Sequence, residues 1–360
     1  MAPTSGHDWH NIGVYLLLCY NVKVISRRVR EAHMDHQTSF ADLMGSGQKR
    51  VTRREAFLEQ MDAVVPWDKW VVLIAPYYHS QATGRKIRGA EVMLRMYLLQ
   101  VWFSLSDEGT EDSVADSLAM QRFMRLDLID EQVPDATTLL KFRHMLEEHH
   151  LTEAMFRELS TILEESGVMM RGGSIVDATF IEAPSSTKNA DRARDPEAHQ
   201  AKKGNNWHFG YKAHTGVDAG SGLVHTVVVT SANVSDVTIA RKLVRKDDLF
   251  CYADSGYTGV GKREEIVSDP RLSRVDWKIA KRPSRMKELR ERNNWERYLE
   301  SRKASVRSKV EHPYLIVKRQ FGWAKTRYRG IAKNLSLMYV AFASANLAMC
   351  ARAGRKLVTV

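Results

Sequence analysis

The chain has 360 residues, of which 44% are hydrophobic, so it can bury a sizeable core, split between two domains. Its 54 Lys and Arg residues exceed its 43 Asp and Glu residues, and the net charge of +11 suits a polyanionic partner, although many ordinary proteins are also basic. The three cysteines (Cys19, Cys251 and Cys350) stand far apart, which excludes a disulfide framework or a zinc-finger spacing and fits a reducing cytoplasm. None of the 13 histidines belongs to an HExxH motif, which argues against a zinc hydrolase.

The first 50 residues predict a poorly ordered leader. Its apolar run at residues 12–19 is too short to span a bilayer. The run also lacks the basic stretch before it and the small-residue cleavage site after it that a signal peptide needs, so no membrane association is expected. One hypothesis is that Met34 is the natural start and that residues 1–33 are an upstream translation extension.

Residues 51–166 have a helical pattern and no convincing strand, which predicts a helical domain for DNA binding and assembly. Apolar residues recur at helical spacing from Phe57 to Val65 and again from Val92 to Leu99. The segment 134–146 begins with capping residues and continues as an amphipathic helix. This helix could place three side chains in a DNA groove, or it could be a plain packing layer. The three candidates are Lys141, Arg143 and His144.

From Gly172 onward the pattern changes to strands alternating with helices, and residues 167–360 predict a second, catalytic domain. Strands are expected at 174–181, 207–217, 223–230, 249–253 and 275–280, with a helix at 237–245. The polar stretch 185–206 predicts a mobile loop. Helices are expected at 285–303, 305–325 and 335–353. This α/β order suits a mixed sheet flanked by helices, as in an RNase-H-like domain, although periodicity alone does not single out that fold.

Two aspartates occupy positions that suit catalysis. Asp177 lies inside an apolar strand, and Asp254 ends another strand just before a turn. A carboxylate placed there costs stability unless a partner compensates its charge, and a metal ion is one such partner. Carboxylate oxygens suit Mg²⁺ or Mn²⁺, and two such ions about 4 Å apart can serve a phosphoryl transfer. The alternatives are a buried acid paired to an arginine and a simple turn cap.

Glu311 is the best of several candidates for a third acid. Arg307, Glu311 and Lys318 are spaced to form one polar stripe on a helix, which is also the pattern of an exposed ion-paired face. Pro313 complicates that helix, which could instead begin near Glu311. The rivals are Glu182, which points to the opposite face of its strand from Asp177, and Glu264.

Positive charge is concentrated in the helical segment 281–333. This segment contains 17 Lys and Arg residues but five acidic ones, so its excess of twelve exceeds that of the whole chain. Such a stripe is typical of a phosphate-binding surface, although a solvated helical face gives the same pattern.

Several long segments resemble transposases of the bacterial insertion sequence five family. They are IVDATFIEAPSSTKN (175–189), DPE (195–197), KKGNNWHFGYKAH (202–214), YADSGY (252–257) and VEHPYLIVKRQFG (310–322). The stretches 52–58 and 134–144 also look like that family's helical domain, so the similarity covers nearly the whole chain from Met34.

The resemblance implies a DDE transposase in which Asp177, Asp254 and Glu311 are the catalytic acids and hold two Mg²⁺ or Mn²⁺ ions. The Asp-x-Gly-Tyr element includes Tyr257, and the Tyr-Arg-Glu-Lys signature includes Arg307 and Lys318. The Tyr position of that signature holds Ala304 here, which puts the contribution of that side chain in doubt. Further expected DNA contacts follow the first acid: Lys203, Trp207, His208, Lys212 and His214.

The implied activity is endonucleolytic cleavage at the ends of a transposable element, followed by transfer of the 3′-hydroxyls to target DNA. Its partners would be the terminal inverted repeats and the target DNA. A homodimer or larger assembly is expected because two DNA ends must be held together, in the bacterial cytoplasm at the nucleoid. The alternatives are a nuclease without strand transfer and a repressor that binds without cutting. A glycosidase built on paired carboxylates would not explain the basic segment.

Overall fold

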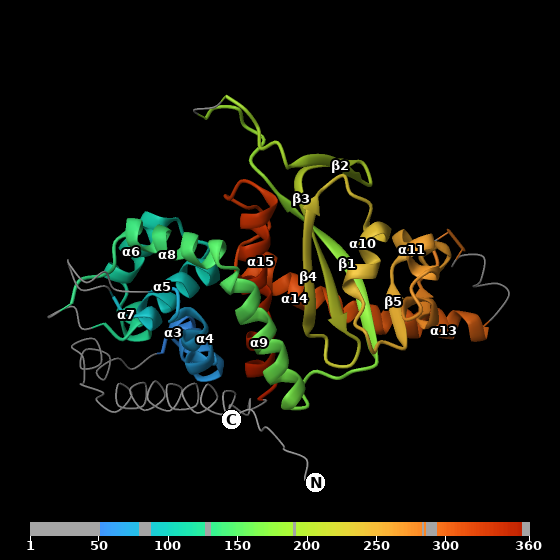
Figure 1. The fold of residues 1–360 in the computed structure, drawn as a ribbon, viewed down its shortest axis with the longest axis horizontal. Helices are drawn as coiled ribbons and strands as arrows, with labels where there is room; N and C mark the ends of the chain where they lie inside the picture. Colours follow the sequence, from blue (N-terminus) through green and yellow to red (C-terminus); the bar gives the residue numbers. More distant parts are fainter. Residues whose placement is uncertain are drawn as a thin grey trace, which may run out of the picture. The chain divides into compact units, whose positions relative to one another are not determined.

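The computed structural model describes residues 51–78, 88–126, 131–189, 192–282, 284–285 and 294–354, and within these ranges the chain forms one compact unit. The expected leader, residues 1–50 with the hypothetical start at Met34, lies outside the described residues. Helices fill the first half and a six-stranded sheet the second (Figure 1), which confirms the predicted α/β fold class. The predicted domain division at residue 166 stays a prediction.

The helical half contains seven helices within its described residues: α3 (Arg53–Val64), α4 (Trp67–Ile74), α5 (Ala90–Phe103), α6 (Asp107–Asp116), α7 (Leu118–Met124), α8 (Ala136–Glu148) and α9 (Leu151–Glu165). Local sequence fixes several helix starts. Thr52 and Glu55 form a capping box before α3, and the Asp135 side chain accepts from Thr138 N at the start of α8. Helix α5 is buried almost all around, so the other helices pack about it.

Helix α15 (Ile331–Arg352) joins the two halves. It contacts α3, α5 and α9 on one side and β4 on the other, and one hydrophobic core runs continuously from the helices to the sheet. By length and composition α15 is also apolar enough to cross a membrane, but 78% of its most apolar window is buried inside the protein. Its hydrophobicity is therefore that of a core helix.

The sheet is formed by β1 (Gly173–Glu182), β2 (His199–Lys203), β3 (Asn206–Asp218), β4 (Val224–Ser231), β5 (Phe250–Ala253) and β6 (Asp276–Ile279). Strand β3 pairs antiparallel with β1, β2 and β4, whereas β1, β5 and β6 are parallel. Without the edge strand β2, the order is β4-β3-β1-β5-β6, with three antiparallel strands (β1, β3 and β4), two further strands parallel to β1, and β1 central, which is the RNase-H-like order. Ile175 faces the large core and Val176 a second core beneath α10 (Asp236–Leu243), so both faces of β1 are covered.

The prediction of a mobile loop over residues 185–206 is wrong in its second half. Residues 199–203 form β2, which pairs with the start of β3 through a tight turn at Gly204, whose φ is +61°. The strand was missed because it is polar on both faces. It carries exposed charged side chains, as edge strands commonly do, and so has no apolar alternation.

After β6, α15 bears out the helix expected at 335–353, and α13 (Asn294–Arg307) overlaps the one expected at 285–303. Short elements replace the helix expected at 305–325. Before β6, around α11 (Glu264–Val267), the chain is mostly irregular. A 3-10 turn (η4, Ser308–Val310) leads to α14 (Glu311–Leu315), which is followed by a π-helical turn (η5, Ile316–Gln320). Helix α14 therefore begins at Glu311, as the alternative prediction for this segment stated. Pro313 falls in its first turn, where a missing N–H removes no helical hydrogen bond.

Candidate active site

Strand pairing places Asp177 beside Asp254. Val176 of β1 is the Cα partner of Ala253 of β5, and each aspartate is the next residue in its strand direction. Because the two strands are parallel, both carboxylates emerge at the end of β5. On the other side of β1, Asp177 pairs with Thr215 of β3. A register shift of one residue would turn Asp177 to the opposite face of the sheet.

Asp177 is largely buried among charges of both signs. Its side chain is 16% exposed, Ala178 N donates to its Oδ1 at 2.8 Å, and Nη1 of Arg307 lies 3.5 Å from its Oδ2. The pKa of this carboxyl is raised to about 7, mainly by burial and also by the charges of Asp254 and Glu311, against the opposing effects of the Ala178 N–H and Arg307. Asp177 therefore lacks enough positive charge around it to hold a fully ionised carboxylate at low cost.

Asp254 is fixed by its own turn. It is the N-cap of η1 (Ser255–Tyr257), and its Oδ1 accepts from Gly256 N at 2.8 Å. A Cβ at Gly256 would lie 2.9 Å from the same oxygen, so this position requires glycine. The Asp-x-Gly element thus has a local structural reason, and it leaves the other carboxylate oxygen, Oδ2, free of this cap.

Glu311, Arg307 and Lys318 come from three short consecutive elements. Arg307 is the last residue of α13, the exposed Glu311 begins α14, and Lys318 lies in η5. Nζ of Lys318 donates to Thr179 Oγ1 on β1 at 3.1 Å, two residues beyond Asp177. Burial lowers the pKa of Lys318, as does Lys203, while Glu182 and Glu311 oppose this shift. The charge of Glu311 therefore reaches both Asp177 and Lys318.

The three acids share one electrostatic environment but do not converge on a single point. Across the described ranges, no three Asp, Glu, His or Cys side chains approach closely enough to hold one ion together. The donor set nevertheless fits divalent cations that prefer carboxylate oxygens and retain water. A cation between Asp177 and Asp254 would offset the repulsion that raises the Asp177 pKa.

The two rival acids lie elsewhere. Glu182 is exposed near the end of β1, where its Oε1 is 3.1 Å from Nδ1 of His208. Glu264 begins α11 and is exposed. Neither carboxylate is among the charges that shift the Asp177 pKa, whereas Glu311 is one of them. On geometry, Glu311 is the better third acid.

Three of the residues expected to contact DNA are turned inward, so the prediction that they contact DNA directly must be corrected. His214 is fully buried, and burial lowers its pKa to about 4, so it is neutral and cannot pair with phosphate. Tyr257 is 1% exposed. Lys212 is mostly buried and donates to Val234 O and Asp236 Oδ1, both at 2.9 Å. Alternation along β3 places Lys212 and His214 on the covered face, whereas Tyr257 is buried in η1.

The exposed candidates are Lys203, Trp207 and the half-buried His208. They lie on the β2–β3 hairpin, where Trp207 is 66% exposed and His208 stacks on Phe180 with ring centroids 4.9 Å apart. These three side chains remain available to a ligand.

Of the two interpretations of helix α8, the packing layer fits Arg143. Arg143 of α8 is buried, with Nη1 2.6 Å from Asp107 Oδ1 and 3.0 Å from Gln100 Oε1. It is committed to joining α5, α6 and α8. Lys141 and His144 of the same helix are exposed. Arg143 thus belongs to the packing layer that was the alternative interpretation.

Asp236 was missed in the sequence. It is the first residue of α10, its carboxylate accepts from Lys212, and its Oδ1 is 3.8 Å from Nδ1 of His214. Burial and the charges of Asp236, Asp177 and Asp254 raise the pKa of Tyr257. Asp236 therefore acts on Tyr257 in the same direction as the two catalytic candidates, and in the sequence it stands only at the start of an ordinary helix.

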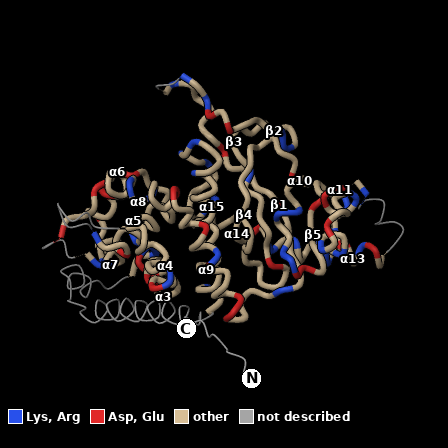
Figure 2. The backbone as a smooth tube through the Cα atoms, viewed as in Figure 1, with Lys and Arg blue, Asp and Glu red and all other residues tan. Residues whose placement is uncertain are grey.

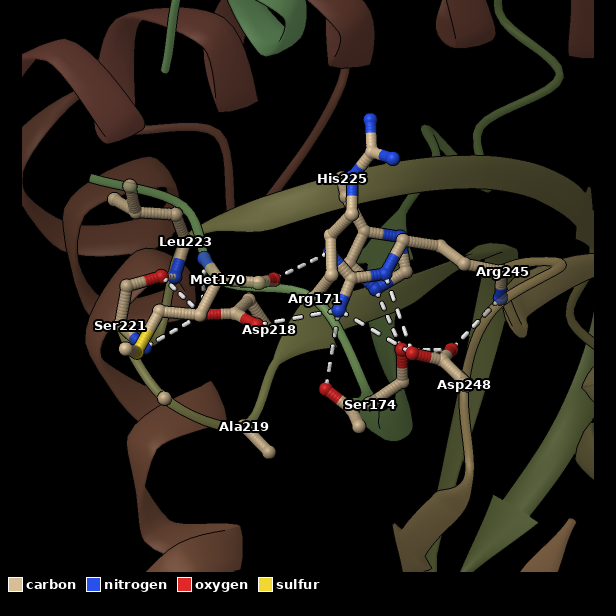
Figure 3. Close-up of polar contacts among 12 residues, drawn as sticks. Met170, Arg171, Ser174, Asp218, Ala219, Ser221, Leu223, His225, Arg245 and Asp248 are labelled. Atoms are coloured by element: carbon tan, nitrogen blue, oxygen red, sulfur yellow. Dashed lines mark hydrogen bonds and ion pairs between the residues drawn. The ribbon is translucent and has the colours of Figure 1, made fainter. Parts of the chain in front are cut away.

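A second polar network joins the beginnings of β1 and β5 (Figure 3). Ser174 donates to Asp248 and lies 2.9 Å from Nε2 of His225, while Nη2 of Arg245 is 3.2 Å from Asp218 Oδ1. Asp248 also accepts from Arg245 N at 2.8 Å. Ser174 and Cys251 are Cα partners, and each precedes its catalytic candidate by three residues. The network therefore fixes the register that brings Asp177 beside Asp254.

Acidic and basic residues are mixed along the chain around α11 and α13, as Figure 2 shows. Several cations of the basic segment 281–333 are engaged within the protein. Lys281 pairs with Glu296, and Lys303 with Glu300. Lys309 donates to Ala219 O and Gly220 O. The number of cations available to a ligand is therefore smaller than the 17 Lys and Arg residues of the segment.

Comparison with known families agrees with this geometry. Residues 169–347 match the family described as a transposase DDE domain, and residues 46–145 match a transposase domain (DUF772). The first match contains the sheet, Asp177, Asp254 and Glu311, and the second contains most of the helical half. The chain therefore contains a transposase DDE domain and a second transposase domain, which together support a DDE transposase.

Among solved structures, the chain is similar to a cryo-EM structure of a piggyBac transposase synaptic complex with hairpin DNA. The TM-score is 0.43 and the identity 10%, covering 86% of this chain and 78% of that one. A similarity of this size adds nothing to the assignment of individual residues.

Proposed function

We propose that the protein binds the terminal inverted repeats of an insertion sequence, cleaves its ends and transfers the 3′-hydroxyls to target DNA. The observation that carries this proposal is the adjacency of Asp177 and Asp254 at the end of β5, with Glu311 close enough to affect the Asp177 pKa. The segments quoted above support membership of the insertion sequence five family. Action as a homodimer or larger assembly, in the bacterial cytoplasm at the nucleoid, belongs to the same proposal.

Asp177, Asp254 and Glu311 are the residues that would hold two Mg²⁺ or Mn²⁺ ions. Such ions, when bound, neutralise phosphate charge and lower the pKa of a bound water or hydroxyl. Beside these acids, Arg307 holds Asp177 in place. Lys318 of η5 presents a positive charge at Thr179, two residues beyond Asp177 on β1. Both cations suit the non-bridging oxygens of a phosphodiester, whose negative charge must be balanced during transfer.

The test is an assay with the purified chain, labelled linear DNA carrying the element's ends, and Mg²⁺. A transposase gives cleaved ends and joined products, a nuclease gives cleavage alone, and a repressor gives binding alone. Asp177→Asn, Asp254→Asn and Glu311→Gln should each abolish cleavage and joining while DNA binding persists. Glu264→Gln is the matched control because this rival acid is exposed and is not among the charges that shift the Asp177 pKa. If the three variants cut normally, these acids are not the catalytic ones.

A further inference from the structure

A polar pocket with a volume of about 350 Å³ lies at the end of β1, beside the β2–β3 hairpin. One wall is a short segment that extends the sheet: Ala324 O accepts from Glu182 N at 3.0 Å, and Thr326 N donates to Glu182 O at 2.8 Å. Between these bonds, Lys325 lines the pocket. The opposite wall is the hairpin itself, through Gln200 and Trp207. The upper part of Figure 1 shows where β2 and β3 meet.

The lining combines aromatic faces with polar groups of both signs. Trp207 is 66% exposed at the rim, and His208 is held by stacking on Phe180 and by its contact with Glu182. The guanidinium of Arg194 lies over the ring of Phe209 at 5.6 Å. Flat apolar faces beside cations and hydrogen-bonding side chains suit a nucleobase attached to its phosphate.

The loop that carries Arg194 is tied down by the Asp-Pro-Glu segment at 195–197. Asp195 accepts from Gly330 N at 2.8 Å and from the hydroxyl of Tyr211. Glu197 accepts from Ile331 N at 2.6 Å. Both acids thus fasten the loop to the chain that follows Lys325, so the two sides of the pocket are held in place before any ligand arrives.

The pocket lies along β1 from the proposed catalytic acids. Glu182 is five residues beyond Asp177, which is roughly 17 Å along a strand. Lys318, bonded to Thr179, lies between them and is close enough to Lys203 for their charges to interact. Positive groups therefore mark a path from the acids to the pocket, and a DNA strand a few nucleotides long could follow it.

We propose that this pocket binds one unpaired nucleotide of the DNA strand that is cut, with its base stacked on Trp207. A volume of about 350 Å³ is at the lower end for ligand pockets, so it admits one base but not a duplex. A base reaches such a pocket only when it has left the double helix. Arg194 and Lys325 face its phosphate, and Gln200 and Glu182 face its polar edge. The proposal rests on the proposed function, because its ligand is the substrate strand.

The test uses the full chain in a chelating buffer, so that nothing is cut, and two DNA probes. One is a duplex of arbitrary sequence with a four-nucleotide single-stranded tail containing 2-aminopurine, and the other is the same duplex fully paired. Binding should quench the tail fluorescence. Trp207→Ala should weaken binding of the tailed probe roughly 5- to 150-fold, abolish the quenching and leave the paired probe unaffected. Trp207→Phe should retain most of both effects.

Tyr77→Ala is the matched control, since Tyr77 is an exposed aromatic residue outside the basic segment 281–333. This variant should leave the quenching unchanged. The proposal is overturned if Trp207→Ala keeps the quenching, or if it weakens both probes equally, which would indicate a general DNA surface. Because the assay needs no cleavage, a chain that quenches the tail but never cuts DNA would refute the proposed function and not the pocket. A chain that cuts but ignores the tail would refute the pocket alone.

Discussion

Arg307 places its guanidinium Nη1 3.5 Å from Oδ2 of Asp177, across the junction between α13 and the central strand of the sheet. The contact opposes the rise of the Asp177 pKa, but that pKa is still about 7 because burial raises it most and the charges of Asp254 and Glu311 act in the same direction as burial. A single cation therefore leaves the acidic site short of positive charge. This shortage gives the site a pH dependence that can be measured without DNA.

The stability of the chain should depend on the ionisation of Asp177. Its pKa is raised from 3.8 to about 7 in the folded protein. Between these values the unfolded state has released the proton and the folded state retains it, so the free energy of unfolding falls as the pH rises. Above the folded-state pKa, the ionised Asp177 lowers the free energy of unfolding by a constant amount. In chelating buffer, Asp177→Asn should therefore have a higher Tm than the wild type, by an amount that grows from about pH 4 to about pH 7 and then stays constant.

Mg²⁺ should narrow that difference near pH 8 by stabilising the ionised wild type and not the Asn variant. A Tm difference that is the same at acidic and alkaline pH would mean that Asp177 titrates normally. Glu264→Gln, at an exposed acid away from the site, should show no such pH dependence.

The basic segment should contribute to DNA binding through Arg297 and Arg302, which are exposed on α13. Lys303 is a poorer choice because its Nζ donates to Glu300 Oε1 at 2.8 Å, and Arg290 lies outside the described residues. Replacing Arg297 and Arg302 with Ala should weaken binding to all DNA sequences. It should also reduce the slope of log affinity against log salt by up to about 2, measured by fluorescence anisotropy. An unchanged slope would show that α13 faces away from DNA, and Lys69→Ala with Arg157→Ala provides a control of equal charge.

Lys212 should act on the fold and not on DNA. Its ammonium holds the start of α10 through Val234 O and Asp236, so Lys212→Ala should lower the free energy of unfolding by about 1–3 kcal/mol. The salt dependence of DNA binding should not change. Lys203→Ala, at an exposed lysine of the neighbouring hairpin, should give the reverse pattern, with stability within about 0.5 kcal/mol of the wild type. Thermal melts and binding titrations on both variants distinguish the two roles.

Asp248 should be a main stabiliser of the sheet register. Asp248→Ala removes the acceptor for Ser174 and leaves Arg245 with fewer partners in a buried place, which should cost about 2–5 kcal/mol in unfolding free energy. The adjacent Asp247 is 44% exposed and only 3.7 Å from an exposed Arg171, so Asp247→Ala should cost less than about 1 kcal/mol. Equal losses from the two variants in denaturant melts would rule out this role of the network.

Much of the fold was determined by sequence patterns that act locally. Apolar periodicity predicted the helices around the buried α5 and the strands β1, β3, β4, β5 and β6, because each of these has a face that must be buried. The polar strand β2 has no such face and was missed. The Asp-x-Gly turn was equally local, since Gly256 is required by the carboxylate two residues before it.

Tertiary structure decided which charged residues meet. The sequence favoured Asp177 and Asp254 separately, but only the parallel register of β1 with β5 places them side by side. It presented Arg143, Lys212 and His214 as cations for DNA, and the packing of α8 and β3 buried them. Pairing across a sheet and burial on one of its faces depend on contacts between residues far apart in the chain. Residue type and spacing carry the chemistry of such groups, whereas the folded chain determines whether a ligand can reach them.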